Sequence, residues 1–134
     1  MMKIKGTIIP QGYGGATNSI REQEPLIKRY VPEISSMRFG TVNVRLESPI
    51  LAPPYDVETP SIEWQKGRWE KFGFIRAEIQ LCTPESETAH CLLYYAETSP
   101  YHSDPFIVEV VTKDFGLIRT RECFIMLKGK DSAS

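Results

Sequence analysis

The strongest strand pattern in the chain is Phe72-Gly73-Phe74-Ile75-Arg76-Ala77-Glu78-Ile79-Gln80-Leu81. A polar segment follows at residues 83–88, and then comes a second apolar run, His90-Cys91-Leu92-Leu93-Tyr94-Tyr95-Ala96. Two apolar runs joined by a short polar segment are typical of a β-hairpin. The sequence therefore predicts an antiparallel pair of strands within residues 72–96.

Further strands are expected on both sides of this hairpin, at residues 3–9, 41–46, 106–111 and 123–127. A short helix is expected to begin at Pro25 and to end at Pro32, because apolar residues recur between them at helical spacing. Strands without alternating long helices favour an antiparallel sheet closed into a barrel. We therefore expect a mainly β fold: a small six-stranded β-barrel with one or two short helices, forming a single domain over 1–127 with a polar tail over 128–134.

Composition narrows the class of protein. The chain has 134 residues, of which 41% are hydrophobic and 25% charged, and its net charge is −1. A nearly balanced charge favours neither nucleic acid nor an anionic membrane surface as partner. No apolar run is long enough to span a bilayer and no signal-peptide pattern opens the chain, so a cytoplasmic location is expected.

Three widely spaced cysteines with two histidines do not suggest zinc, and we expect buried, reduced thiols.

A polar face on one expected strand gives the leading site candidates. In Gly40-Thr41-Val42-Asn43-Val44-Arg45-Leu46 the apolar and polar residues alternate, as in a half-buried strand. The neutral oxygens of Thr41 and Asn43 are suited to hydrated Mg²⁺, and Arg45 to phosphate. The alternative is that this face simply meets water, as is common in antiparallel sheets.

Two loops supply further candidates. Gly12, Gly14 and Gly15, followed by Ala16 and Thr17, form a glycine-rich segment whose backbone N–H groups could cradle an anion. Glycine also serves ordinary connections between elements, which is the alternative for this segment.

The second loop runs from Ser99 to Pro105, and its two prolines would fix Tyr101 and His102 in place. Glu109 follows as the one acid in an apolar run, so it either points outward on a wet face or is paired. The aromatic residues of the chain allow a stacking surface for a ligand, although packing explains them equally well: these are Trp64, Trp69, Tyr94 and Tyr95.

Taken together, these motifs resemble those of the archaeal-type CTP-dependent riboflavin kinases, which are single-domain six-stranded cradle-loop barrels. The resemblance is carried by residues 6–16, Gly40 to Leu46, residues 72–81, and Tyr101-His102-Ser103 with Glu109. It implies phosphoryl transfer from CTP to the 5′-hydroxyl of riboflavin, with Mg²⁺ as cofactor. In that family the matching residues bind Mg²⁺ (Thr41, Asn43), the nucleotide (Gly12, Gly14, Gly15, Ala16, Thr17) and the flavin (Tyr101, His102, Glu109).

The sequence also departs from this family. Pro100 replaces the threonine that precedes Tyr-His, and residues 113–122 do not match the family's C-terminal nucleotide-binding segment. Arg119 or Arg121 is a substitute phosphate contact in this interpretation. One alternative is therefore a non-catalytic module that binds a flavin, a nucleotide or another small anion. A third is an unrelated enzyme on the same barrel, because a fold does not fix its chemistry.

Overall fold

The computed structural model describes most of the chain. The described residues are 2–9, 16–37, 41–52, 54–82, 88–99, 104–113 and 121–128, with the side chains of 16–19 excepted.

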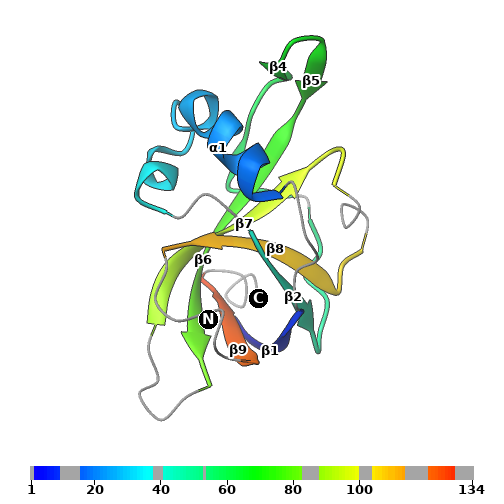
Figure 1. Cartoon of the computed structure of the whole chain (residues 1–134). Helices are drawn as coiled ribbons and strands as arrows, with labels where there is room; N and C mark the ends of the chain where they lie inside the picture. Colours follow the sequence, from blue (N-terminus) through cyan, green and yellow to red (C-terminus); the bar gives the residue numbers. More distant parts are fainter. Residues whose placement is uncertain are drawn as a thin grey trace.

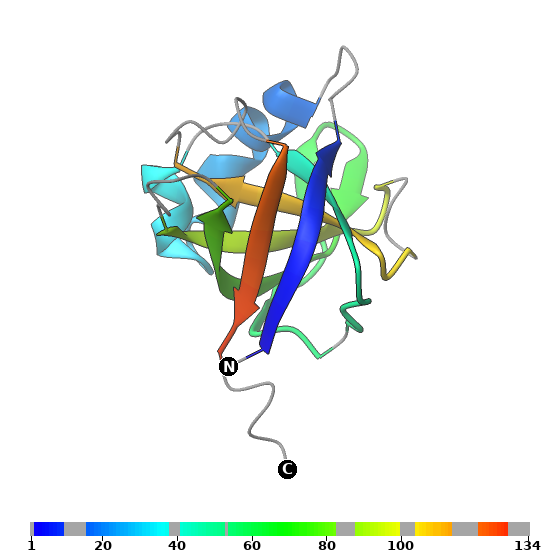
Figure 2. The same ribbon diagram turned by 90° about the horizontal axis from the view of Figure 1, so that it is seen from below.

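Six strands form a closed antiparallel barrel, which confirms the expected fold class. They are β1 (Met2–Ile9), β2 (Val42–Leu46), β6 (Phe72–Leu81), β7 (Thr88–Ala96), β8 (Ile107–Thr112) and β9 (Glu122–Leu127). Their order is β6-β7-β8-β2-β1-β9, and β9 pairs again with β6 to close the barrel. Figure 1 shows the strands with their labels, and Figure 2 shows β9 and β1 side by side, crossing over β7 and β8.

The barrel interior explains the alternation seen in the sequence. Val42, Val44 and Leu46 of β2 are all buried, whereas Arg45 between them is exposed. All six strands contribute to this core, through residues such as Ile4, Val44, Ile75, Leu93, Val110 and Ile125. The strands also approach one another closely at Gly6, where an added Cβ would lie 2.4 Å from Cγ1 of Val44. A side chain at position 6 would therefore collide with the packed interior.

Three shorter strands lie outside the six-stranded barrel. β3 (Val57–Glu58) pairs with the first part of β6. β4 (Ile62–Gln65) and β5 (Arg68–Glu70) form a separate hairpin that projects beyond the barrel in Figure 1, with Gly67 at a φ of 76° in its turn. All three lie within or just after a part of the chain that holds Pro49, Pro53, Pro54 and Pro60, and proline limits the length of a strand because it cannot donate to the ladder.

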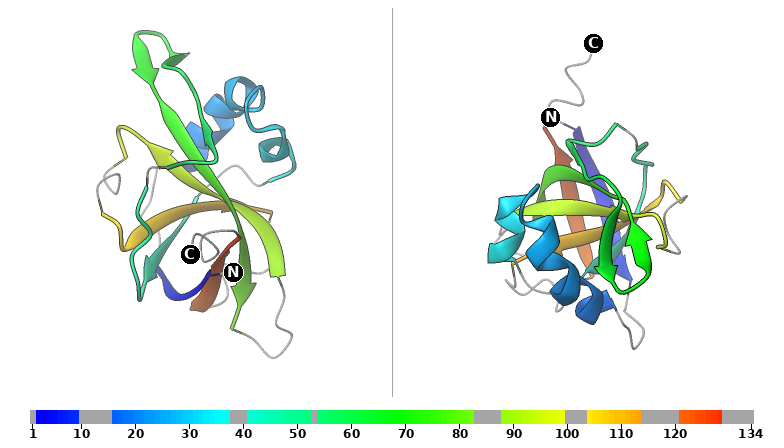
Figure 3. Two further views of the ribbon diagram at one scale, coloured as in Figure 1. Left: turned by 180° about the vertical axis from the view of Figure 1, so that it is seen from behind. Right: turned by 90° about the horizontal axis from the view of Figure 1, so that it is seen from above.

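A helical layer covers the outer face of β6, β7 and β8. It consists of α1 (Ala16–Ile27) and the 3₁₀ helix η1 (Pro32–Ser36), and Figure 3 shows α1 beside the β4–β5 hairpin when the molecule is seen from above. This layer creates a second hydrophobic core, whose members include Ile20, Ile27, Ile34, Phe74, Leu92, Tyr94 and Val111. The side chains on the outer face of these strands are therefore shielded from solvent where the helices cover them.

Two expectations about local structure were wrong. The helix spans Ala16–Ile27 and does not run from Pro25 to Pro32: Pro25 lies near its end, and Pro32 begins the 3₁₀ helix η1. Gln23 faces the barrel and is 2% exposed, and this polar residue interrupts the apolar pattern that would have revealed the helix. Cys91 and Cys123 are buried free thiols as expected, but Cys82 is exposed because it lies just past the end of β6.

Within the described part of the chain, no helix has the length and apolar character needed to cross a bilayer.

Candidate functional site

A cavity of about 200 Å³ lies where α1, the β4–β5 hairpin and the outer faces of β7 and β8 meet. Ile20 and Gln23 of α1 form one side of it, and Thr41, just before β2, forms another. Its polar side chains come from α1, the β4–β5 hairpin, β7, β8 and the segments just before β2 and just after β7, so the cavity exists only in the folded chain. Cavities with a few converging polar groups are the usual places for ligand binding.

Strand register brings Thr41, Asn43 and Glu109 to one side of the sheet. Asn43 of β2 lies opposite Glu109 of β8, and Thr41 is two residues before Asn43 on the same face. Thr41 is 4% exposed and lines the cavity together with Glu109. The Oδ1 atom of Asn43 is buried and has no hydrogen-bond partner among the described residues. Such a buried acceptor costs free energy unless a bound group satisfies it.

Glu109 is held in a half-buried setting. Its carboxylate accepts a hydrogen bond from the Ser99 hydroxyl, which lies at the end of the segment after β7. Burial raises the pKa of Glu109, the nearby Glu70 carboxylate raises it further, and the Ser99 hydrogen bond acts in the opposite direction. The expectation that Glu109 is either on a wet face or paired is thus resolved in favour of a paired carboxylate beneath the helical layer.

This raised pKa predicts a measurable pH dependence of stability. Between the ordinary value of 4.5 and the raised pKa, the folded protein retains a proton that the unfolded chain has released. The free energy of unfolding should therefore fall as the pH rises through this window, by at most about 1.4 kcal/mol per pH unit. Glu109→Gln removes this titration, and urea unfolding of both proteins from pH 4 to 7 measures the difference. The free energy of unfolding of the wild type, minus that of Glu109→Gln, should fall with pH over this range. A value that stays constant or rises with pH contradicts the prediction.

Glu70 anchors the hairpin side of the cavity. Its side chain is 1% exposed, and its Oε1 accepts a hydrogen bond of 3.1 Å from the Trp64 indole N–H. Its Oε2 accepts two bonds from Thr98, one of 2.7 Å from the backbone N–H and one of 2.5 Å from the hydroxyl. Three donors therefore satisfy this buried carboxylate, which ties β5 to the segment after β7.

Arg68 and Tyr94 complete the lining. The Arg68 guanidinium lies 4.4 Å from the centroid of the Trp64 ring, a cation–π contact. Among the described lining residues, Arg68 is the one cation, beside the two carboxylates of Glu70 and Glu109. The Tyr94 hydroxyl donates a 2.7 Å hydrogen bond to Oε1 of Gln23, and burial raises the Tyr94 pKa, so this phenol stays neutral.

The structure brings together part of the set expected from the sequence. Thr41 and Glu109 line one cavity, and Asn43 lies beside Glu109 across the strand pair. Ala16 and Thr17 stand in the first turn of α1 instead of in a loop. The other expected nucleotide and flavin contacts lie outside the described residues: Gly12, Gly14, Gly15, Tyr101 and His102.

Sequence reasoning missed Gln23, Arg68 and Glu70. The Lys66-Gly67 turn between two short alternating runs was a readable hairpin signal for the last two. Nothing local marks Gln23, because its burial depends on the barrel beneath it. Trp64 and Tyr94 are buried and Tyr95 packs against the barrel core, which supports the packing interpretation for these three, although Trp64 and Tyr94 also line the cavity. Trp69 is 60% exposed, so the packing interpretation does not hold for it.

Comparison with known proteins adds no assignment: no protein-family model and no curated protein matches this chain. No group of three or more His, Cys, Asp or Glu side chains with metal-binding geometry occurs among the described residues. Any metal site at this cavity would therefore depend on neutral oxygens and few carboxylates, a donor set that suits Mg²⁺ better than zinc.

Proposed function

We propose that the chain is a Mg²⁺-dependent phosphotransferase that transfers a phosphoryl group from CTP to riboflavin and yields FMN. The observation that carries this proposal is the buried, unpartnered Oδ1 of Asn43, which lies across from Glu109 and shares a face with Thr41. An oxygen acceptor left without a donor is suited to a cation. Mg²⁺ binds such oxygens while keeping several of its waters.

Each side chain has a role in this proposal. Thr41 and Asn43 would hold the metal, which when bound supplies positive charge to the phosphoryl group. Glu109 would accept the hydrogen bond of the attacking hydroxyl, and its raised pKa makes it a better proton acceptor than an exposed carboxylate. Arg68 is the lining cation suited to a phosphate oxygen. Positioning and charge neutralisation dominate such reactions.

The size of the cavity limits what it would enclose. Its volume of about 200 Å³ is below the roughly 300–1,000 Å³ of pockets that enclose a whole drug-sized ligand. In our proposal the cavity therefore holds the reacting ends of the two substrates and not the complete flavin and nucleotide.

Direct product analysis tests the proposal. We expect the full chain, incubated with riboflavin, Mg²⁺ and CTP, to form FMN that chromatography resolves from riboflavin, and EDTA to abolish the reaction. The same assay with ATP, GTP and UTP identifies the preferred donor. Absence of FMN with all four nucleotides would refute the kinase proposal.

A second candidate is a module that binds a flavin, a nucleotide or another small anion without transferring phosphate. Pro100 in place of the threonine that precedes Tyr-His, and residues 113–122, which do not match the family's C-terminal nucleotide-binding segment, favour it. Ligands that bind the folded state raise its melting temperature. A shift caused by riboflavin or FMN in the absence of any product would select this candidate.

A further inference from the structure

A groove of about 220 Å³ lies between the last part of α1 and the β4–β5 hairpin. Leu26, in α1, and Tyr30, just after it, line one wall of this groove, and Trp69 of β5 lines the other. The Glu22 carboxylate on α1 accepts a hydrogen bond from the side-chain amide of Gln65 on β4, which holds the two walls together. Figure 3 shows α1 and the hairpin side by side when the molecule is seen from above. No described residue lines both this groove and the cavity of the candidate functional site.

The groove exposes apolar side chains to solvent. The described part of the chain has four exposed large hydrophobic side chains, and two of them, Leu26 and Trp69, line this groove. Exposed apolar side chains that gather in one place mark interaction surfaces. Tryptophan, tyrosine and arginine contribute most of the binding energy at protein interfaces. Trp69, Tyr30 and Arg29 all line this groove, so its composition is that of an interface centre.

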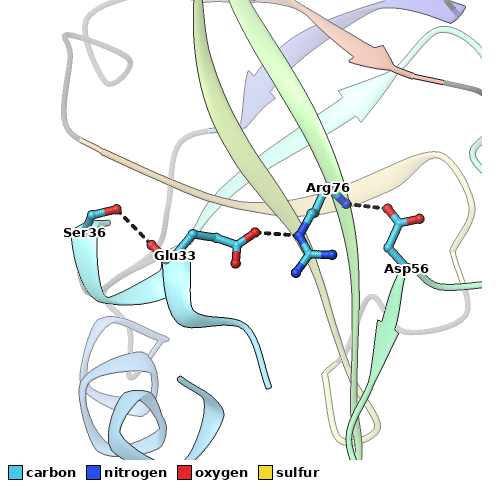
Figure 4. A network of polar contacts seen from close by, with 4 residues as sticks. All are labelled: Glu33, Ser36, Asp56 and Arg76. Carbon is cyan, nitrogen blue, oxygen red and sulfur yellow. Dashed lines mark hydrogen bonds and ion pairs between the residues drawn. The ribbon is translucent and has the colours of Figure 1, made fainter. Parts of the chain in front are cut away.

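The two walls of the groove carry opposite charges that are not paired within the described residues. Arg29 lies on the α1 wall and makes no ion pair there. Glu63 lies on the hairpin wall, where its carboxylate accepts a hydrogen bond from the Gly67 backbone N–H but meets no cation. Arg76 on β6 differs, because its Nε lies 2.5 Å from Oε2 of Glu33, as Figure 4 shows. The charge of Arg76 is thus neutralised within the chain, whereas the charges of Arg29 and Glu63 are available to a partner.

We propose that this groove is the interface of a homodimer, in which a second copy of the chain covers it. A two-fold axis that runs along the groove exchanges its two walls. Arg29 of each copy then faces Glu63 of the other copy, and Trp69 of each copy packs on Leu26 and Tyr30 of the other. A two-fold interface requires a surface that is complementary to itself in this way.

A second copy satisfies both walls at once. Any partner must offer an anion to Arg29 and a cation to Glu63, on either side of an apolar contact, and this chain itself carries that arrangement. The groove is small, and interfaces that bury less than about 1,200 Å² in total are weak. We therefore expect a dimer whose Kd lies in the micromolar range. The interface uses no lining residue of the candidate-site cavity and does not depend on the proposed phosphotransfer.

Sedimentation equilibrium of the full chain, across protein concentrations in the micromolar range, tests this proposal. We expect a monomer–dimer equilibrium, and Trp69→Ser should raise the Kd of the dimer at least tenfold. Lys28→Glu is a control, because Lys28 is exposed beside Arg29 in the sequence but does not line the groove, so the Kd should stay within threefold. A protein that is monomeric at every concentration would overturn the proposal and would assign the groove to a different partner, such as a peptide.

Charge reversal tests which residues face each other. Arg29→Glu alone and Glu63→Arg alone should each raise the Kd at least tenfold, because like charges then meet across the two-fold axis. An equal mixture of the two variants should form a heterodimer with a Kd within threefold of the wild type, because every glutamate in the mixed pair faces an arginine. Circular dichroism checks that each variant is folded. Dimers that survive either single reversal, or a mixture that stays monomeric, would overturn the proposal.

Discussion

Glu70→Ala is expected to lower the free energy of unfolding by about 3 kcal/mol or more. The substitution removes the acceptor of three hydrogen bonds, from the Trp64 indole and from the backbone and hydroxyl of Thr98. Leaving a buried donor unsatisfied costs about 1–3 kcal/mol, and Glu70 is only 1% exposed. Urea unfolding followed by tryptophan fluorescence and by circular dichroism measures the loss.

Glu63→Ala is the matched control for Glu70→Ala. Glu63 lies in the same hairpin and accepts a 2.8 Å bond from the Gly67 backbone N–H, but that contact is exposed to solvent. Its removal should cost about 1 kcal/mol or less. Glu70→Gln keeps the size and one acceptor oxygen of the side chain, so its cost should fall between the two. Equal costs for the two alanine variants would show that the Glu70 network does not stabilise the fold.

The barrel could be predicted from the sequence because the residue patterns that indicate its strands are local. Residues 72–81 are expected and observed as one strand, since a long apolar run bounded by polar residues leaves little choice. The alternation of β2 likewise places Val44 inside the barrel. The closing contact between β9 and β6 needed no motif of its own, because six antiparallel strands with one apolar face each bury those faces best by closing.

The position of the helical layer over the outer face of β6, β7 and β8 could not be predicted from the sequence. Whether Glu109 meets water depends on where α1 lies, and α1 is distant in sequence from β8. The alternation of β2 predicts that Thr41 and Asn43 share a face, but not that Thr41 is 4% exposed. The Glu70 network joins residues that are 28 positions apart, Glu70 and Thr98, and no local pattern encodes such a pairing.

Asn43→Leu is expected to lower Mg²⁺-dependent FMN formation about 100-fold or more, while the folded protein stays at least as stable as the wild type. The loss follows because a metal contributes several kcal/mol to such a reaction, and 2.7 kcal/mol is roughly 100-fold. The retained stability follows because the Asn43 Oδ1 is buried without a partner, so an apolar side chain removes a desolvation cost. Thr41→Val, which is nearly isosteric, should reduce the rate in the same way.

Stability and function therefore pull in opposite directions at Asn43, and this separates a ligand role from a structural one. A structural amide would lose stability together with activity, whereas a metal ligand loses activity alone. Gln80→Leu is the matched control, because Gln80 is a half-buried amide on β6 that lies opposite Thr88 and Phe124 and not beside Glu109, so its kinase rate should be unchanged. Thermal shift gives a readout independent of turnover: Mg²⁺ with CTP should raise the melting temperature of the wild type and of Gln80→Leu, but not that of Asn43→Leu. Full activity in Asn43→Leu, or a rate loss that only parallels the loss of folded protein, would show that Asn43 does not bind a metal.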